Sequence, residues 1–347
     1  MAFEPHAEAG PAGISPWRLA WRRLRANRFA LGFLGLFVAI VLFVLAAPLW
    51  ADDVAHTGPN ATHTLQRVEV DGEKRDVVNR EGRPIGPLWL GAGGRFFLGA
   101  DGRLGRDEMV RLMYGGRTSL LIAFAAALIT TLLATILGLL AGYYRGWTDT
   151  AIARTMDVVW AFPVTLLAIA LGLALAVGGL QIGPLNISGS SIWIPILIIG
   201  LVYTPYMARP IRGEVLALRE KEFVEAAVAQ GAGPLRVMFR ELLPNLSSTI
   251  IVFFTLGIAN NMLLESTLSF LGVGVQPPNT SWGTMIGGGF DLLTSAPLLT
   301  IIPGAMILLT VLAVNVFGDG LRDALDPKSK VRLEVHAGLA EPEGTAV

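Results

Sequence analysis

Long uncharged segments recur along the 347-residue chain, and each is about as long as a bilayer is thick. Because a helix rises 1.5 Å per residue, a membrane span needs roughly 20 predominantly apolar residues. One uncharged segment, 158–208, is too long for a single span and is interrupted by glycine-rich turns. We therefore predict an all-α polytopic membrane protein with six transmembrane helices. The predicted spans are residues 29–50, 118–144, 158–177, 191–208, 246–264 continuing towards 271, and 292–317.

The polar segments divide the remaining chain. Residues 1–28 form an N-terminal arm in which Trp17, Ala20, Trp21 and Leu24 share one helical face, so we predict an amphipathic helix at the membrane surface. The first apolar segment is too long for a signal-peptide core and ends without a small-x-small site, which favours a retained helix over a cleaved one. The predicted division is therefore 1–28 arm, 29–50 first span, 51–117 extracytoplasmic segment, 118–328 permease core and 329–347 tail.

Lys and Arg gather in the arm, in the turn after residue 144, in the connection 209–245 and in the tail, whereas the loops 178–191 and 272–291 contain neither. Cytoplasmic loops carry an excess of these residues, so both termini are expected inside the cytoplasmic membrane. The segment 51–117 is long enough to cross regardless of its charge. Within it, residues 62–90 alternate between apolar and polar positions and predict a small β-hairpin, and a helical pattern begins at residue 106.

Composition narrows the function. Hydrophobic residues make up 53% of the chain and charged residues only 16%, with 27 cations balanced by 27 anions. A nucleic-acid binder would need a basic face, which this balance disfavours. The absence of cysteine excludes disulfides, thiolate zinc sites and a cysteine nucleophile. No P-loop, H-E-x-x-H or G-x-S-x-G motif occurs, so we expect no enzyme activity, ATPase site, cofactor or metal in this chain.

The connection 209–245 between the fourth and fifth predicted spans is too polar for lipid and helical in type. We predict one helix over 214–230, a stop at Gly231, and a second helix over 234–243 that ends at Pro244. Two interpretations remain open from the residues alone. The connection is either a solvated hairpin that joins two spans, or a docking element that transmits the movement of a cytoplasmic partner.

The motifs of this connection resemble those of a known protein family. Glu225-Ala226-Ala227, then Gly231, then Leu243-Pro244-Asn245 resembles the EAA loop of bacterial ABC-importer permeases. Three further stretches resemble the C-type subunit of dipeptide/oligopeptide permeases, and together they span roughly residues 95–328. They are 98–120 before the second helix, 265–283 after the fifth, and 318–327 at the end of the core. Ala100 stands where that family commonly has Thr, and 62–94 is longer than expected.

The resemblance implies a permease subunit that moves peptides or related small solutes across the cytoplasmic membrane. Its implied partners are a B-type sister permease, two ABC ATPase subunits that hold ATP and Mg, and an extracytoplasmic solute-binding protein. The residues that it assigns to coupling with the ATPase are Glu222, Glu225, Ala226, Ala227, Gly231, Leu243 and Pro244.

An ion-coupled secondary transporter is the alternative function. Such carriers usually place ionisable residues near mid-membrane, whereas Asp157 and Glu265 lie near the ends of their predicted spans. Asn260 and Asn261 lie mid-helix, where they either face a translocation path or bond a neighbouring helix. Glu265 either serves an outer gate or partner, or bonds loop backbone. Finally, Gly138 and Gly142 offer a close-packing face whose use the sequence leaves open.

Overall fold

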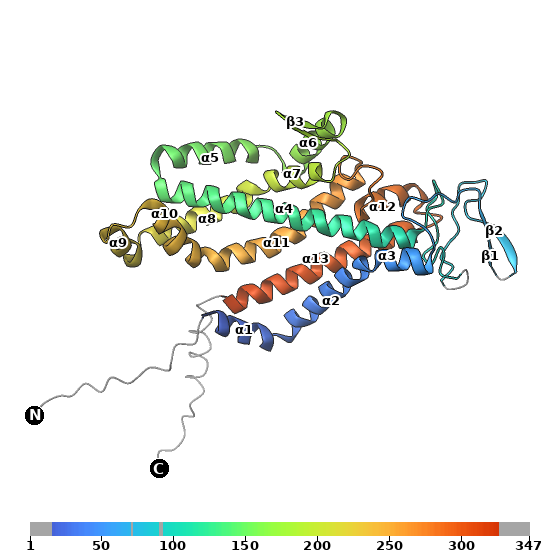
Figure 1. Ribbon diagram of the computed structural model, residues 1–347, viewed down its shortest axis with the longest axis horizontal. Helices are drawn as coiled ribbons and strands as arrows, with labels where there is room; N and C mark the ends of the chain where they lie inside the picture. Colours follow the sequence, from blue (N-terminus) through green and yellow to red (C-terminus); the bar gives the residue numbers. More distant parts are fainter. Residues whose placement is uncertain (1–15, 71, 90–92, 326–347) are drawn as a thin grey trace, which may run out of the picture.

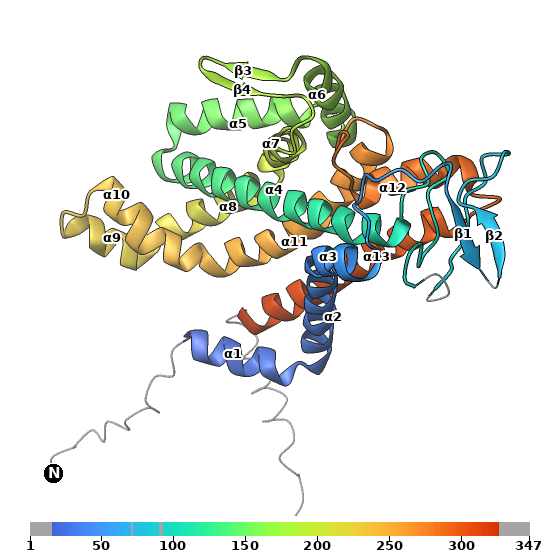
Figure 2. The same cartoon turned by 45° about the vertical axis from the view of Figure 1, so that its right-hand side comes forward.

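The computed structural model describes residues 16–70, 72–89 and 93–325 and is predominantly helical (Figure 1). The first 15 residues of the predicted arm and the whole predicted tail lie outside the described residues. Helices α9 and α10 lie at one end of the molecule, and α12 and the β1–β2 hairpin lie at the other (Figures 1 and 2). We call these the α9 end and the α12 end. The helices are α1 Pro16–Ala26, α2 Arg28–Leu45, α3 Ala47–Leu49, α4 Glu108–Tyr144, α5 Gly146–Trp160, α6 Val164–Gly178, α7 Trp193–Val202, α8 Thr204–Arg219, α9 Glu222–Ala229, α10 Pro234–Arg236, α11 Leu243–Phe270, α12 Trp282–Gly289 and α13 Leu298–Leu325.

Within the described residues, four helical segments are long and apolar enough to cross a membrane. They are Arg28–Leu45, Glu108–Tyr144, Pro234–Phe270 and Leu298–Leu325. Two bent pairs also qualify when each pair is taken together, α5 with α6 at 83° and α7 with α8 at 40°. The structure therefore contains four to six candidate spans.

Prolines break the third and fourth predicted spans. The predicted helix 158–177 is wrong at its start, because α5 ends at Trp160 and α6 begins only at Val164, after Pro163. A residue that precedes proline is disfavoured in the α conformation, which accounts for the interruption at Phe162. The predicted helix 191–208 is also divided at Tyr203, where Pro205 lies in the first turn of α8 and lacks the N–H that would continue α7.

The connection after α8 differs from its prediction in two ways. The helix expected over 214–230 is broken, because Lys221 is extended (φ −89°, ψ 145°) and separates α8 from α9. The helix expected over 234–243 does not end at Pro244. It passes through a π-helical turn, Val237–Leu242, in which the Leu243 N–H bonds the Met238 carbonyl, and runs on into α11. This wider turn accommodates the proline without ending the helix.

The last predicted span, 292–317, is displaced along the chain. Helix α13 begins at Leu298, after a 3₁₀ turn at Phe290–Leu292, and continues to Leu325. Gly318 and Gly320 do not end it, because both pack closely against neighbours. A Cβ at Gly318 would lie 3.0 Å from Thr255 Oγ1, and one at Gly320 would overlap Ala30. Tertiary contact thus offsets the low helix propensity of glycine.

The segment 51–117 folds largely as predicted. A π-helical turn, Trp50–Val54, follows α3, and strands β1 Arg67–Val70 and β2 Glu73–Asp76 pair antiparallel, which confirms the hairpin. Asp107 caps α4, since its carboxylate accepts the Val110 N–H at 3.1 Å and the Phe96 N–H at 2.6 Å. Burial raises the pKa of this carboxyl. A second hairpin, β3 Leu180–Ile182 and β4 Leu185–Ile187, follows α6 and was not predicted.

Helix α4 lies at the centre of the fold and packs along α8, α11 and α7 (Figure 2). Gly138 and Gly142 form its contact with α8, where an added Cβ would lie 2.6 Å from Ile211 Cγ2 and 2.6 Å from Val215 Cβ, respectively. At the other end, Gly116 packs against Trp282, which is fully buried and donates from Nε1 to the Leu112 carbonyl at 2.9 Å. The glycine pair thus serves packing within the chain, as small residues do between helices in lipid.

We expect Gly142→Ala to destabilise the protein by about 1–3 kcal/mol, because overpacking a close contact forces the two helices apart. Gly213→Ala in α8 is the matched control, because Gly213 is exposed and has nothing within 4 Å of an added Cβ. Thermal unfolding of the two purified variants measures the difference. A thermal midpoint equal to wild type for Gly142→Ala would contradict the close packing of α4 on α8.

Candidate functional site

The hairpin of α9 and α10 projects from the α9 end (Figure 1). Helix α9 ends in a Schellman motif, in which the Ala232 N–H bonds the Ala227 carbonyl at 3.0 Å and the Gly231 N–H bonds the Val228 carbonyl at 2.9 Å. Gly231 has φ +84°, a conformation that glycine adopts without strain. Pro234 then begins the following helix at its first turn.

One face of this hairpin is buried and the other is open. Val224 is 2% exposed and packs with Val237 and Leu242 in a cluster that continues into α8 and α4. The open face carries four large apolar side chains, which sequence reasoning missed. They are Phe223, Val228, Leu235 and Phe239, with 39–65% of each exposed. An exposed apolar patch of this kind is typical of an interaction surface.

The structure places the seven predicted coupling residues on or beside this hairpin. Glu222, Glu225, Ala226 and Gly231 are exposed on it, and Ala227 is half-buried. Leu243 and Pro244 lie at the start of α11, where Leu243 packs against the buried cluster and Pro244 is exposed. The first five residues therefore lie on the hairpin that also carries the exposed apolar side chains, whereas the last two lie at its base.

Ion pairs and a hydrogen bond connect α8 to α5 and to the end of α4. Helix α9 follows α8 closely in the chain. Arg212 pairs with Asp149, with Nη2 and Oδ2 2.6 Å apart. Arg209 lies 3.8 Å over the Trp160 ring and donates to Asp157 Oδ1 at 2.7 Å. At the end of α8, Arg219 donates to the Tyr143 carbonyl at 2.7 Å, and Glu220 pairs with Arg145. A displacement of α9 would therefore move α5 and α8 together.

Two neighbouring cavities lie among the helices next to this region. One has a volume of about 450 Å³ and is lined by α8, α11 and α13, with Glu214, Asn245 and Arg322 among its polar residues. The other has a volume of about 330 Å³ and shares Phe253 and Leu256 with the first. We call this second space the inner cavity; its lining includes Thr130, Tyr203, Tyr206, Met207, Gly257, Asn260, Asn261, Asn315 and Asp319.

The inner cavity gathers Asn260 and Asn261 but not Glu265. Asn261 is 1% exposed, and its Nδ2 has no hydrogen-bond partner within the described residues. Glu265 is fully buried elsewhere in α11 and accepts a hydrogen bond from Ser269 Oγ at 2.7 Å, so its bond is to a side chain rather than to loop backbone. Sequence reasoning missed Tyr203, Asn315 and Asp319. The four-residue spacing of Asn315 and Asp319 places both on one face of α13 and was the available signal.

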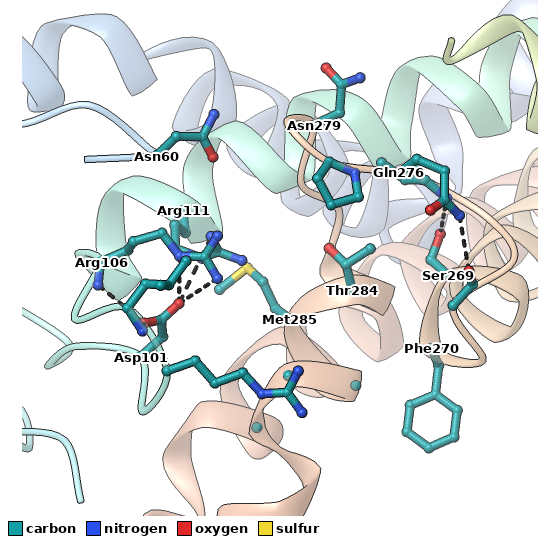
Figure 3. A pocket seen from close by; sticks show the side chains of 18 of the residues that line it. Asn60, Asp101, Arg106, Arg111, Ser269, Phe270, Gln276, Asn279, Thr284 and Met285 are labelled. Atoms are coloured by element: carbon teal, nitrogen blue, oxygen red, sulfur yellow. Dashed lines mark hydrogen bonds and ion pairs between the residues drawn. The ribbon is translucent and has the colours of Figure 1, made fainter. Parts of the chain in front are cut away.

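A third cavity lies at the α12 end and has a volume of about 570 Å³. We call it the outer-segment cavity. It lies between the start of α4 with the loop before it and the end of α11 with α12 (Figure 3). Asp101, Arg106 and Arg111 gather on one side of it, and Ser269, Phe270 and Gln276 lie on the other. Within the described residues, no cluster of His, Asp and Glu is arranged to hold a metal ion.

We expect Gly231→Ala to weaken the end of α9 by about 1–2 kcal/mol, because a side chain is strained at positive φ. Gly233→Ala is the matched control two residues away, since Gly233 has φ −71° and both glycines have open space around an added Cβ. Hydrogen exchange of the amides in 222–236 reports the change. Equal exchange in the two variants would contradict the Schellman geometry.

Comparison with known proteins identifies relatives over nearly the whole chain. The profile of the binding-protein-dependent transport system inner membrane component family matches residues 134–331, and that of the N-terminal TM domain of oligopeptide transport permease C matches residues 15–66. The chain is 36% identical to the dipeptide transport system permease protein DppC of Alkalihalophilus pseudofirmus, covering 94% of each chain. It is 37% identical to the glutathione transport system permease protein GsiD of Pectobacterium atrosepticum, covering 91% of this chain and 92% of that protein.

Among solved structures, the chain is similar to one from the inward-facing MetNI methionine ABC transporter. The TM-score is 0.52 at 15% sequence identity, over 63% of this chain and 97% of that one. At this identity the likeness concerns the fold alone.

Proposed function

The chain belongs to the binding-protein-dependent transport system inner membrane components, as a C-type permease of the dipeptide/oligopeptide group, and from this we propose its cargo, its partners and its working parts. It is a permease subunit of an ABC importer. Two relatives are named for dipeptide and glutathione transport, and both compounds are short peptides or peptide-like. The proposed cargo is therefore a short peptide. The family gives no support to the secondary-transporter alternative.

The proposed assembly contains a B-type sister permease, two ABC ATPase subunits with their ATP and Mg, and an extracytoplasmic solute-binding protein. This chain contributes no ATPase site and no cofactor of its own. Its location is the inner membrane, where each bent helix pair counts as one span, which makes six. Both termini and the α9 end face the cytoplasm, since the connection after α8 is rich in Lys and Arg. The α12 end then faces outside.

The α9–α10 hairpin is the proposed contact with an ATPase subunit. Its open face combines exposed apolar side chains with Glu222 and Glu225, and an interface core of aromatic residues with a charged rim is typical of protein–protein contacts. When the ATPases close on ATP, the hairpin moves with them. The ion pairs of Arg209 and Arg212 carry that movement between α8 and α5, and Tyr206 and Met207 of α8 line the inner cavity.

The inner cavity is the proposed part of the translocation path. Apart from Asp319, which is exposed, its polar groups are amides, hydroxyls and phenols, which offer hydrogen bonds in both directions and suit the peptide group. ATP binding and the loaded solute-binding protein favour opposite openings of the path, so their binding free energies shift its two-state equilibrium.

Combining Glu225→Arg with Gly231→Pro tests the coupling role. We expect ATP-driven peptide uptake by the reconstituted transporter to fall at least about tenfold, because the charge and shape of the docking surface both change. Glu73→Arg on β2, exposed at the opposite end, is the control and is expected to transport normally. Uptake at the wild-type rate in the double variant would refute the coupling role of the hairpin.

Asn260→Trp tests the path. The indole would fill much of the 330 Å³ cavity, so uptake should fall about tenfold or more while the transporter still assembles and still hydrolyses ATP. Leu263→Trp is the matched control on α11, because Leu263 is 47% exposed and lies outside both neighbouring cavities. Comparing uptake with assembly for the two variants separates a blocked path from a misfolded protein. Similar uptake by both variants would place the path elsewhere.

A further inference from the structure

Arg111 is buried beside the outer-segment cavity with most of its hydrogen-bonding capacity unused. It is 6% exposed and lines the cavity. Its one hydrogen bond runs from Nη2 to Thr280 Oγ1 at 3.2 Å, and neither Nε nor Nη1 has a partner within the described residues. A guanidinium keeps its charge in proteins and presents a planar fork of donors that matches a carboxylate. Within the described residues, Nε and Nη1 therefore lack hydrogen-bond acceptors at the wall of the cavity.

Asp101 forms an ion pair with Arg111 but accepts no hydrogen bond from it. Asp101 Oδ1 accepts the Leu104 and Arg106 N–H groups at 2.8 and 3.2 Å, and Oδ2 accepts Arg106 Nε at 2.6 Å. Arg111 Nη1 is 4.0 Å from Asp101 Oδ2, beyond hydrogen-bond distance. Figure 3 shows the three side chains together, with Asp101 facing both arginines. Asp101 thus serves chiefly to hold Arg106 and the loop before α4.

Glu108 adds a second group of opposite sign. It lines the same cavity, is 7% exposed, and its carboxylate has no hydrogen bond within the described residues. It precedes Arg111 by three positions on α4, so the two side chains lie on neighbouring turns of one helix face. Glu108 and Arg111 attract each other, so the wall of the cavity presents a carboxyl and a guanidinium about one helical turn apart. Nε and Nη1 of the guanidinium have no hydrogen-bond partner within the described residues.

The opposite wall is uncharged. It presents Ser269, Phe270, Gln276, Asn279 and Thr284 (Figure 3). At about 570 Å³ the cavity lies within the range of small-molecule sites, roughly 300–1,000 Å³. Two extended residues span roughly 7 Å, so a dipeptide with both charged ends fits this space.

We propose that the outer-segment cavity binds a small zwitterionic solute, with its carboxylate on Arg111 and its ammonium on Glu108. This inference rests on the proposed peptide cargo and deepens it, because it makes the permease itself select both ends of the solute. The outward-facing end of the path then discriminates by the charges at both ends of the solute.

The test measures binding of alanyl-alanine to the assembled transporter in lipid nanodiscs, with no solute-binding protein added. Its C-terminal amide and its N-acetyl derivative are the comparison ligands. The wild type should bind alanyl-alanine at least about tenfold more tightly than either derivative, because a site built for a charged group rejects an analogue that lacks it. Equal binding of all three by the wild type would overturn the proposal without any variant.

Single substitutions then test which residue binds the carboxylate of the dipeptide and which binds its ammonium group. Arg111→Gln should remove the preference over the amide, and Glu108→Gln the preference over the N-acetyl peptide, each leaving the other preference in place. Arg83→Gln is the control, because Arg83 is exposed in the same outer segment and does not line the cavity. A preference that survives its matched variant would overturn that assignment.

ATP-driven uptake of alanyl-alanine, measured with the solute-binding protein present, distinguishes a failure of the zwitterion site from a failure of the proposed peptide cargo. Uptake together with equal binding of the three ligands overturns only the zwitterion site. No ATP-driven uptake of any peptide by the wild type overturns the proposed cargo as well.

Discussion

The close contact of α4 with its neighbours is the constraint on which the rest of this structure depends. Lipid tails are as apolar as leucine side chains, so helices in a bilayer associate by packing rather than by escape from water. Gly138 and Gly142 let α8 approach the backbone of α4, and Gly116 admits the Trp282 ring at the other end. A single 37-residue helix thereby positions both the α9 end and the α12 end.

In this arrangement a single helix, α8, connects the proposed docking surface to the proposed path. Helix α8 contacts α4 through the glycine pair, carries Arg209 and Arg212, and leads into α9 after one extended residue. Tyr203, which precedes α8, lines the inner cavity. Packed helices shift between discrete arrangements rather than deform continuously, so on the proposed function a movement of the hairpin would change the shape of that cavity.

The outer-segment cavity and the inner cavity differ in the charge of the residues that line them. The outer-segment cavity gathers arginines and acids on one wall, whereas Asp319, which is exposed, is the one charged residue among the described lining of the inner cavity. Between them, Glu265 is fully buried and bonded to Ser269. On the proposed function, a solute would be selected by its charges where it enters and held by neutral groups further in, which favours release.

The local sequence pattern was sufficient to predict the structure of a segment wherever a single property, such as apolar length or alternation, decides that structure. The long apolar segments predicted the main helices, alternation predicted the β1–β2 hairpin, and short motifs predicted the family. Proline shows the limit, because Pro163 and Pro205 interrupt two helices that were predicted to be continuous. Pro244 was predicted to end a helix, but a π-helical turn that packing stabilises accommodates it. The cavities could not be predicted, because residues far apart in the sequence form them. Asn261 and Thr130 line one cavity, and Arg111 donates to Thr280, each pair separated by more than a hundred residues. The sequence by itself thus determined a helical permease with a polar connecting loop. Only the tertiary structure decided which polar groups stay unpaired, because pairing depends on neighbours that a local pattern does not contain.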